Sequence, residues 1–175
     1  MSDVPGRVPD PAEVADRLAI QEVLAWHSRG LDRLDVAALK ACYWPEAEVD
    51  YGSYKGGAHV FADLVVGALG EGYELTRHGL GNQVIVIRDN TARVETCVSA
   101  GHLFPGAEQD MHFYGRYLDR LEKRGDEWKI MHRQVVMDWN KLLPVDDQRD
   151  SDAFKDLAKG GRHPEDPLYA FLAAD

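Results

Sequence analysis

The sequence predicts an α+β fold in which three helices cover one face of a curved antiparallel sheet. Three helical segments come first in the chain, and four segments rich in strand-forming residues follow them. The strand segments are joined by short turn-like stretches, RDN, PGAEQ and KRGDE, which favour antiparallel hairpins. Helices followed by a meander of long strands are typical of the α+β class.

The first helix is expected to begin at Pro11, with Asp10 as its N-cap. Four residues then recur at spacings of four, three and four, which marks one buried helical face: Ile20, Leu24, His27 and Leu31. A second helix, capped by Asp35, is expected to run through Tyr43 until Pro45 stops it. A third is expected from residue 58 to about residue 69.

Strands are expected at residues 48–54, 75–87, 91–104, 111–121 and 128–139. Side chains two positions apart on a strand share a face, and two such faces each end in a histidine. One face comprises His78, Leu80, Asn82, Val84 and Val86, and the other Ala92, Val94, Thr96, Val98, Ala100 and His102.

The 175 residues fit one domain, long enough to bury a substantial core. Residues 1–11 are expected to form an N-terminal arm, residues 12–140 the domain, and residues 141–175 an extension that packs on the domain or on a neighbouring subunit. The extension contains two short helical candidates, one near residues 152–159 and one that begins behind Asp166.

The last long strand is expected to present apolar side chains on both faces of the sheet. Its two sets of residues are Met131, Val135, Met137 and Trp139 on one side, and Ile130 and Val136 on the other. Because both faces then need cover, we expect a homodimer or homotrimer.

A formal charge of −10 and a pI near 5.1 argue against nucleic acid or an anionic membrane surface as a partner. Basic residues do cluster between Arg116 and Arg133, but acids alternate with them, which is typical of a solvated hairpin. The cysteines, Cys42 and Cys97, form no CxxC pair, so a reducing cytoplasm is expected. Neither a signal peptide nor a membrane-spanning apolar stretch is recognisable.

A candidate base, His78, lies in the stretch LTRHGLGN, and a candidate partner, Asp32, lies in RGLDRLD. An imidazole takes up and releases protons near neutral pH, and a carboxylate that accepts its other ring N–H fixes the tautomer. Asp32 falls near the C-terminal end of a helix, where the macrodipole disfavours a negative charge, so a purely helical role explains it poorly. A simple turn role for Asp32 remains an alternative.

Motifs for other chemistries are weak or missing. Gly79 and Gly81 precede a strand pattern instead of a helix, which does not suit a nucleotide-binding loop. The sequence contains no HExxH, no paired CxxC and no nucleophile elbow. We therefore expect neither a cofactor nor a metal.

The chain resembles the SnoaL-like branch of the NTF2-like superfamily across residues 13–140. The segments that carry the resemblance are AIQEVLAWHSRGLDRLDVAALKACYWPEAEVDYG, LTRHGLGN and GRYLDRLEKRGDEWKIMHR. The resemblance implies a cone-shaped α+β barrel whose curved sheet encloses an apolar pocket.

Within this superfamily the pattern is similar to scytalone dehydratase and to the hexachlorocyclohexane dehydrochlorinases, which use an Asp-His dyad. The resemblance places that dyad at Asp32 and His78. It also matches Tyr51 and His102 to a tyrosine and a second histidine of the dehydratase, which implies hydrogen bonds to a developing oxyanion or a departing hydroxyl.

Departures from these patterns leave the substrate open. The chain has Leu31 where the dehydratase has a second tyrosine, and Gly115 and Tyr117 where it has a serine and an asparagine. His27 stands where the dehydrochlorinases have a lysine, although an inward histidine is more often a hydrogen-bonded core residue. The residues expected to contact substrate are Trp26, His27, Asn82 and Tyr117.

The expected function is that of a cofactor-independent lyase or isomerase acting on a small apolar, cyclic or aromatic substrate. Dehydration, dehydrohalogenation and retro-aldol release of formaldehyde all suit the same base. The alternative is a non-catalytic protein that binds a small molecule in the same fold. The dyad distinguishes the two, because a simple binder has no need of a base with an orienting acid.

Overall fold

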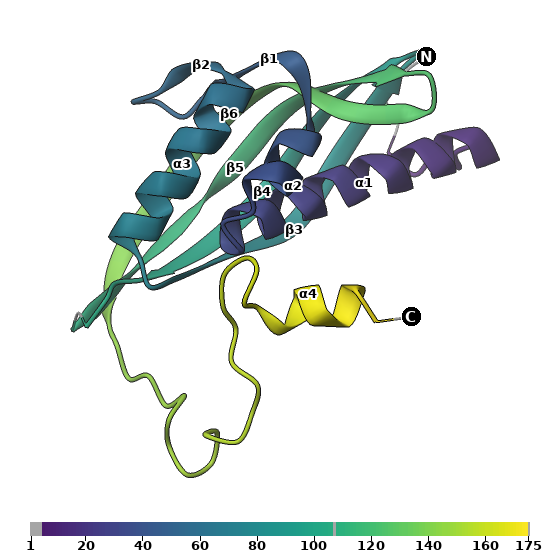
Figure 1. Ribbon diagram of the computed structural model, residues 1–175. Helices are drawn as coiled ribbons and strands as arrows, with labels where there is room; N and C mark the ends of the chain where they lie inside the picture. Colours follow the sequence, from purple (N-terminus) through teal and green to yellow (C-terminus); the bar gives the residue numbers. More distant parts are fainter. Residues whose placement is uncertain (1–4, 107, 175) are drawn as a thin grey trace.

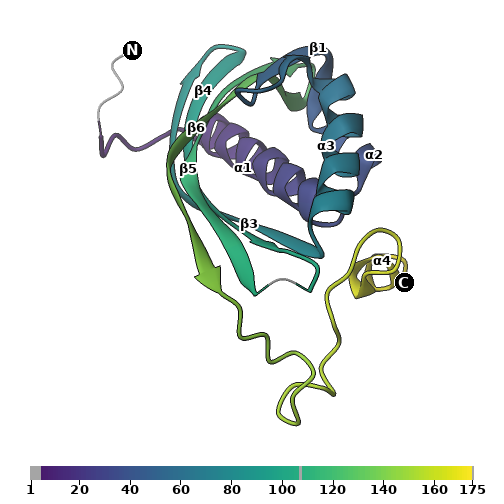
Figure 2. The ribbon, with the colours of Figure 1, turned by 90° about the vertical axis from the view of Figure 1, so that its left-hand side faces the viewer.

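Three helices pack inside the curve of a six-stranded sheet, as Figures 1 and 2 show. The computed structural model describes residues 5–106 and 108–174. In chain order the elements are α1 (Pro11–Asp32), α2 (Val36–Ala41), β1 (Tyr43–Asp50), β2 (Lys55–Gly57), α3 (Ala58–Gly72), β3 (Leu75–Arg88), β4 (Thr91–Leu103), β5 (Gln109–Arg124), β6 (Glu127–Pro144) and α4 (Pro167–Leu172). The predicted α+β class is confirmed.

The strands lie in the order β2-β1-β6-β5-β4-β3. Neighbouring strands are antiparallel throughout the meander from β3 to β6, as predicted. The pair of β1 and β6 is parallel, so the sheet is mixed at that point. The sheet is strongly curved but does not close into a barrel, and β2 and β3 are its edges.

The predicted helix starts are confirmed by their caps. Asp10 accepts a hydrogen bond from the backbone N–H of Glu13 at 2.9 Å, and Asp35 accepts one from Ala38 at 2.9 Å. The second helix ends at Ala41, earlier than predicted, because Tyr43 already begins β1 and pairs with β6. Strand pairing here overrides the local helical pattern.

Alternation along β4 follows the prediction, but β3 departs from it. The register of β3 on β4 shifts between Leu80 and Gln83, so one additional residue is inserted and the side chains beyond it change faces. Ile85 is therefore buried, whereas Val84 is 60% exposed. The prediction that Asn82 and Val84 share the face of His78 is wrong for this reason.

β6 also contains a bulge, because Leu121 pairs with Ile130 while Arg120 pairs with His132. Met131 is the additional residue. Before it, the side chains of β6 that face the core belong to even-numbered residues such as Ile130, and beyond it they belong to odd-numbered residues. Arg133 consequently points into the protein and is fully buried. A second shift occurs beside Gly115, where a Cβ atom would lie 2.2 Å from the carbonyl oxygen of Val136.

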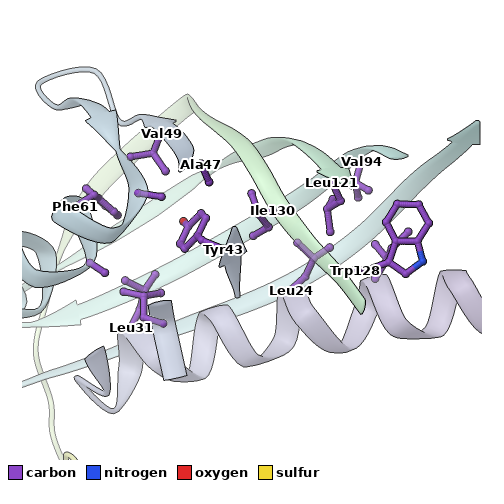
Figure 3. Packing of buried hydrophobic residues seen from close by; sticks show 14 of the residues in the cluster. Leu24, Leu31, Tyr43, Ala47, Val49, Phe61, Val94, Leu121, Trp128 and Ile130 are labelled. Carbon is purple, nitrogen blue, oxygen red and sulfur yellow. The ribbon is translucent and has the colours of Figure 1, made fainter. Parts of the chain in front are cut away.

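The hydrophobic core lies between the concave face of the sheet and the helices (Figure 3). Leu24 and Leu31 of α1 pack with the strands, and Phe61 of α3 covers the side near β1. None of the described helices is long and apolar enough to cross a membrane.

After β6 the chain runs away from the sheet and returns to the C-terminal end of α1, where α4 lies (Figure 1). The helix predicted near residues 152–159 is replaced by turns. The predicted cap of the last helix is confirmed, since Asp166 accepts from the backbone N–H of Leu168 at 2.9 Å.

Candidate functional site

Asp32 and His78 form a hydrogen-bonded pair where α1 ends beside β3. His78 Nδ1 lies 2.7 Å from Asp32 Oδ1, and the His78 backbone N–H donates to Asp32 Oδ2 at 2.9 Å. Thr76 Oγ1 donates to Oδ1 at 3.2 Å. These donors compensate the carboxylate for its place at the negative end of the helix dipole. The side chains of His78 and Asp32 are only 8% and 9% exposed, respectively.

The pair fixes the tautomer of His78. A carboxylate only accepts hydrogen bonds, so the ring proton lies on Nδ1 and the lone pair of the neutral imidazole lies on Nε2. Asp32 Oδ1 holds the ring and Asp32 Oδ2 holds the backbone N–H of His78, while Thr76 holds Asp32, so the direction of that lone pair is set by β3 and the end of α1. Such an arrangement suits a general base.

His102 of β4 adjoins His78, with the two rings nearly perpendicular and their centroids 5.6 Å apart. Its Nδ1 is buried and has no hydrogen-bond partner in the part of the chain that the structure describes. Burial, and then the charge of His78, lower the pKa of His102 to about 4. His102 is therefore neutral at pH 7 and presents an unused polar atom next to the dyad.

A cleft of about 600 Å³, the main cleft, includes both histidines and Asp32. β3 and β4 form one wall, and the chain beyond β6 contributes Val145, Asp146, Asp147, Arg149 and Gly160 to the other. Charged side chains are frequent in the lining, and the cleft is open to solvent. In this respect it differs from the enclosed apolar pocket expected from the sequence.

Behind the dyad, the inside of the curved sheet is filled by a cluster that we call the inner cluster: His27, Tyr43, Tyr117, Asp119 and Arg133. Arg133 donates two parallel hydrogen bonds to Asp119 at 2.7 and 2.8 Å, and both side chains are buried. The basic stretch between Arg116 and Arg133 is thus not wholly a solvated hairpin. The bulge at Met131 accounts for this failed expectation, because it turns Arg133 inward.

His27 lies in the inner cluster with both ring nitrogens engaged. Arg133 Nη1 is 2.8 Å from His27 Nδ1, and Tyr43 Oη is 2.7 Å from Nε2. A guanidinium only donates, and Arg133 Nη1 is nearer to Nδ1 than to Nε2, from which it lies 3.2 Å, so Nδ1 accepts and Nε2–H donates to Tyr43. Burial, followed by the Arg133 charge, lowers the pKa of His27 well below its usual range.

Two tyrosines from the predicted site are also placed inside. The Tyr51 ring stacks on Phe61 at 4.0 Å, and its hydroxyl is buried without a hydrogen-bond partner among the described residues. Burial raises the pKa of Tyr51, so the hydroxyl keeps its proton at neutral pH. Tyr117 lies under the Arg133 guanidinium, 4.1 Å from the ring centroid. Neither tyrosine lines the main cleft.

Trp26 and Asn82 are not brought to the dyad. Trp26 is 39% exposed on α1, where its indole N–H donates to Glu22 and Arg29 stacks on its ring. Asn82 is exposed in the bulge of β3. Trp26 lies beside the buried face of α1 that the helical spacing predicts, whereas the position of Asn82 results from the register shift in β3, which the sequence pattern does not reveal.

Sequence reasoning missed Thr76, which shares a strand face with His78 and orients its partner. A threonine two positions before the candidate base was an available signal, because residues two apart on a strand point the same way. It also missed Asp119 and Arg133, for which the sequence offers no signal of burial. In the described ranges, no group of three or more His, Cys, Asp or Glu side chains is arranged to hold a metal ion.

The sequence profile of the SnoaL-like domain matches residues 12–134, which include every residue of the dyad and the inner cluster. The chain belongs to the SnoaL-like family. This family lies within the NTF2-like superfamily, in agreement with the open curved sheet and its helices. An uncharacterized protein of Mycobacterium tuberculosis is 27% identical over 136 residues, covering 75% of this chain and 92% of the relative.

Solved structures share the fold at lower identity. A putative scytalone dehydratase from Novosphingobium aromaticivorans superposes with a TM-score of 0.68 at 23% identity, covering 77% of this chain and 91% of that one. A hexachlorocyclohexane dehydrochlorinase, LinA-type3 from Novosphingobium barchaimii, gives a TM-score of 0.70 at 20% identity, covering 77% and 94%. At these identities the likeness establishes the fold alone.

Proposed function

We propose that the protein is a cofactor-independent lyase or isomerase that begins its reaction by proton abstraction at His78. The observation that carries the proposal is the 2.7 Å hydrogen bond between His78 Nδ1 and Asp32, at the edge of a cleft large enough for a small organic molecule. The dehydratase and dehydrochlorinase names of structural neighbours support the same reaction class. A protein that only binds ligands gains nothing from an oriented base.

In an elimination, His78 Nε2 takes a proton from a substrate carbon. The electron pair of that C–H bond becomes the new double bond, and the leaving group departs with the electrons of its own bond. Asp32 stabilises the imidazolium that forms. If the leaving group is a hydroxyl, the imidazolium returns the proton to it and water is released. In an isomerisation no group leaves: the electron pair of the broken C–H bond shifts to a neighbouring position, and the imidazolium returns the same proton to another carbon.

His102 is placed to support this step. It is neutral at pH 7, it adjoins His78 and lines the main cleft, and its buried Nδ1 has no hydrogen-bond partner among the described residues. We assign the catalytic contacts to His78 and His102 and the orienting role to Asp32. Tyr51 and Tyr117 lie inside the fold and do not line the main cleft. A substrate would contact them only if part of it extended past the dyad into the interior.

The test is to identify what the protein binds and changes. The purified chain is incubated with cell extract in D₂O, and small molecules are compared by mass spectrometry with an incubation of the His78→Ala variant. We expect a molecule that loses the mass of water or of a hydrogen halide, or that gains deuterium, only with the native chain. Binding without any change in mass would favour the non-catalytic alternative.

We also infer a homodimer or homotrimer, because the convex face of the sheet exposes large apolar side chains. Val84 and Trp139 are 60% and 51% exposed there. Met137 pairs with Gly115 and therefore lies on the concave side with Arg133, so the prediction that Met137 and Trp139 share a face is wrong. An apolar convex face of this kind is usually covered in solution. Sedimentation at micromolar concentration should show a dimer or trimer, and a stable monomer would contradict the inference.

A further inference from the structure

The chain beyond β6 forms part of the wall of the main cleft, although it lies outside the segment that matches the SnoaL-like family. Residues 145–166, which we call the strap, leave the end of β6 and return to the end of α1 (Figure 2). Val145, Asp146 and Arg149 of the strap line the same cleft as His78 and His102. One side of the entrance to the dyad is therefore formed by the strap, which is not part of the segment that matches the SnoaL-like family.

The strap is joined to the residue that follows Asp32 in the chain. Arg33 Nη1 donates to Asp166 Oδ2 at 3.0 Å and to the carbonyl oxygen of Gly161 at 2.7 Å. The backbone N–H of His163 donates to the Arg33 carbonyl oxygen at 2.7 Å. We call this set of contacts the clasp. It connects the strap to the end of α1, directly beside the dyad carboxylate.

Two further residues of the strap, Arg149 and Arg162, hold it to the turn between α3 and β3. Arg162 donates to the carbonyl oxygens of Tyr73 and Glu74, and Arg149 pairs with the Glu74 carboxylate at 2.6 Å. Arg149 is partly exposed, with 37% of its side chain accessible. These contacts are polar, so they are weakened by water and salt more readily than apolar packing is.

Burial of apolar side chains contributes little to the free energy that holds the strap against the rest of the protein. Among residues 145–174, Asp166 alone is buried. Phe154 and Leu157 are 48% and 64% exposed, and α4 has no buried residue. A segment with few buried apolar contacts opens at a low free-energy cost compared with the core. Asp166, which receives hydrogen bonds from Arg33 and from two backbone N–H groups, is the main point of attachment.

We propose that the strap is a releasable cover of the main cleft, and that the clasp between Arg33 and Asp166 controls entry to the dyad. In the closed state, with the clasp formed as in this structure, the strap narrows the cleft on the side of residues 145–149, and the rest of its mouth stays open to solvent. In the open state the dyad is accessible from the side of residues 145–149. The inference rests on the proposed function only in taking the main cleft as the place where substrate binds.

The test compares Asp166→Asn and Arg33→Gln with the native chain and with Asp156→Asn, a control at an exposed aspartate within the strap. Hydrogen-deuterium exchange is followed by mass spectrometry, and carbethoxylation of His78 by diethyl pyrocarbonate is followed by peptide mapping. Loss of the charge-assisted contacts should raise exchange in residues 145–166 and the His78 modification rate by about tenfold. The control should match the native chain.

A second measurement uses the native chain alone. Raising NaCl from about 50 mM to about 500 mM screens the ion pairs, so exchange in the strap should increase while exchange in β4 stays unchanged. The proposal is overturned if both clasp variants leave the strap and His78 unchanged. It is also overturned if exchange rises equally in all elements, because Asp166 would then only stabilise the whole fold. Neither measurement requires turnover, so its outcome is independent of the reaction proposed for His78.

Discussion

The dyad and the inner cluster are two hydrogen-bond systems centred on histidines, and they differ in how many of their polar atoms are satisfied. His27 has both ring nitrogens engaged and is completely buried. His78 has one nitrogen fixed by Asp32 and lines the main cleft. His102, beside it, has a buried nitrogen without a partner in the described structure.

This difference separates a stabilising arrangement from a reactive one. In the inner cluster Arg133 donates to Asp119 and His27, and His27 donates to Tyr43, so loss of one of these members leaves a buried polar group without its partner. In the dyad the partner of the reactive nitrogen must be supplied by a ligand. Variants of the cluster should therefore alter folding, and variants of the dyad should alter turnover.

The largest expected effect is on turnover in dyad variants. His78→Ala removes the base and Asp32→Asn removes the group that fixes its tautomer, so kcat/KM should fall by about 10²–10⁴-fold in each. His132→Ala is a matched control, because His132 lines a groove on the other side of the sheet. Near-native activity of either dyad variant on a confirmed substrate would remove His78 or Asp32 from the mechanism.

The inner cluster should show the largest effect on stability. Asp119→Asn leaves the Arg133 charge buried without its counter-ion and should lower the free energy of unfolding by about 3–5 kcal/mol. Asp138→Asn is the comparison, because Asp138 pairs with Arg116 on the exposed face and should cost less than about 1 kcal/mol. Urea unfolding measures both. Equal losses would mean that burial does not distinguish the two pairs.

Stability should also decrease in acid through His102. Its pKa is lowered to about 4 in the folded chain, so between pH 6.5 and pH 4 the unfolded chain binds more protons. Unfolding is then favoured as the pH falls. His102 alone should lower the free energy of unfolding by about 2 kcal/mol at pH 5. Urea unfolding at pH 7 and pH 5 should give a smaller difference for His102→Asn. A difference as large as that of the native chain would assign the acid sensitivity to other groups.

The smallest expected effect is that of chelation. A neutral imidazole held by a carboxylate is already a competent base near pH 7, so dialysis against EDTA should leave turnover unchanged. The assay compares dialysed and undialysed protein on the same substrate. Loss of activity that zinc or iron restores would instead identify His78 and His102 as metal ligands.

Much of the fold was predictable because its signals are local. Asp10 and Asp35 cap the first two helices as predicted, and the alternation along β4 places His102 inside. Local periodicity could not predict that Asp32 lies next to His78, because 46 positions separate the two residues in the chain. Resemblance to the family supplied that pairing, and the hydrogen bonds agree with it.

The errors arise where the backbone changes phase. Asn82 was placed beside His78 on the assumption of unbroken alternation, which the shift after Leu80 ends. Arg133 was read as a surface cation because its neighbours in sequence are charged. Whether a basic residue is buried depends on a partner such as Asp119 on another strand, and a pattern within one strand does not contain that information.

The bulge at Met131 means that the inner cluster depends on the length of β6 as well as on its residue types. Removal of this one residue would restore regular alternation after Ile130 and turn Arg133 to the convex face, away from Asp119 and His27. No side chain of the cluster would have been altered, yet its hydrogen bonds would be lost. Substitution libraries leave such a determinant untouched, so it becomes visible only when chain length itself is varied.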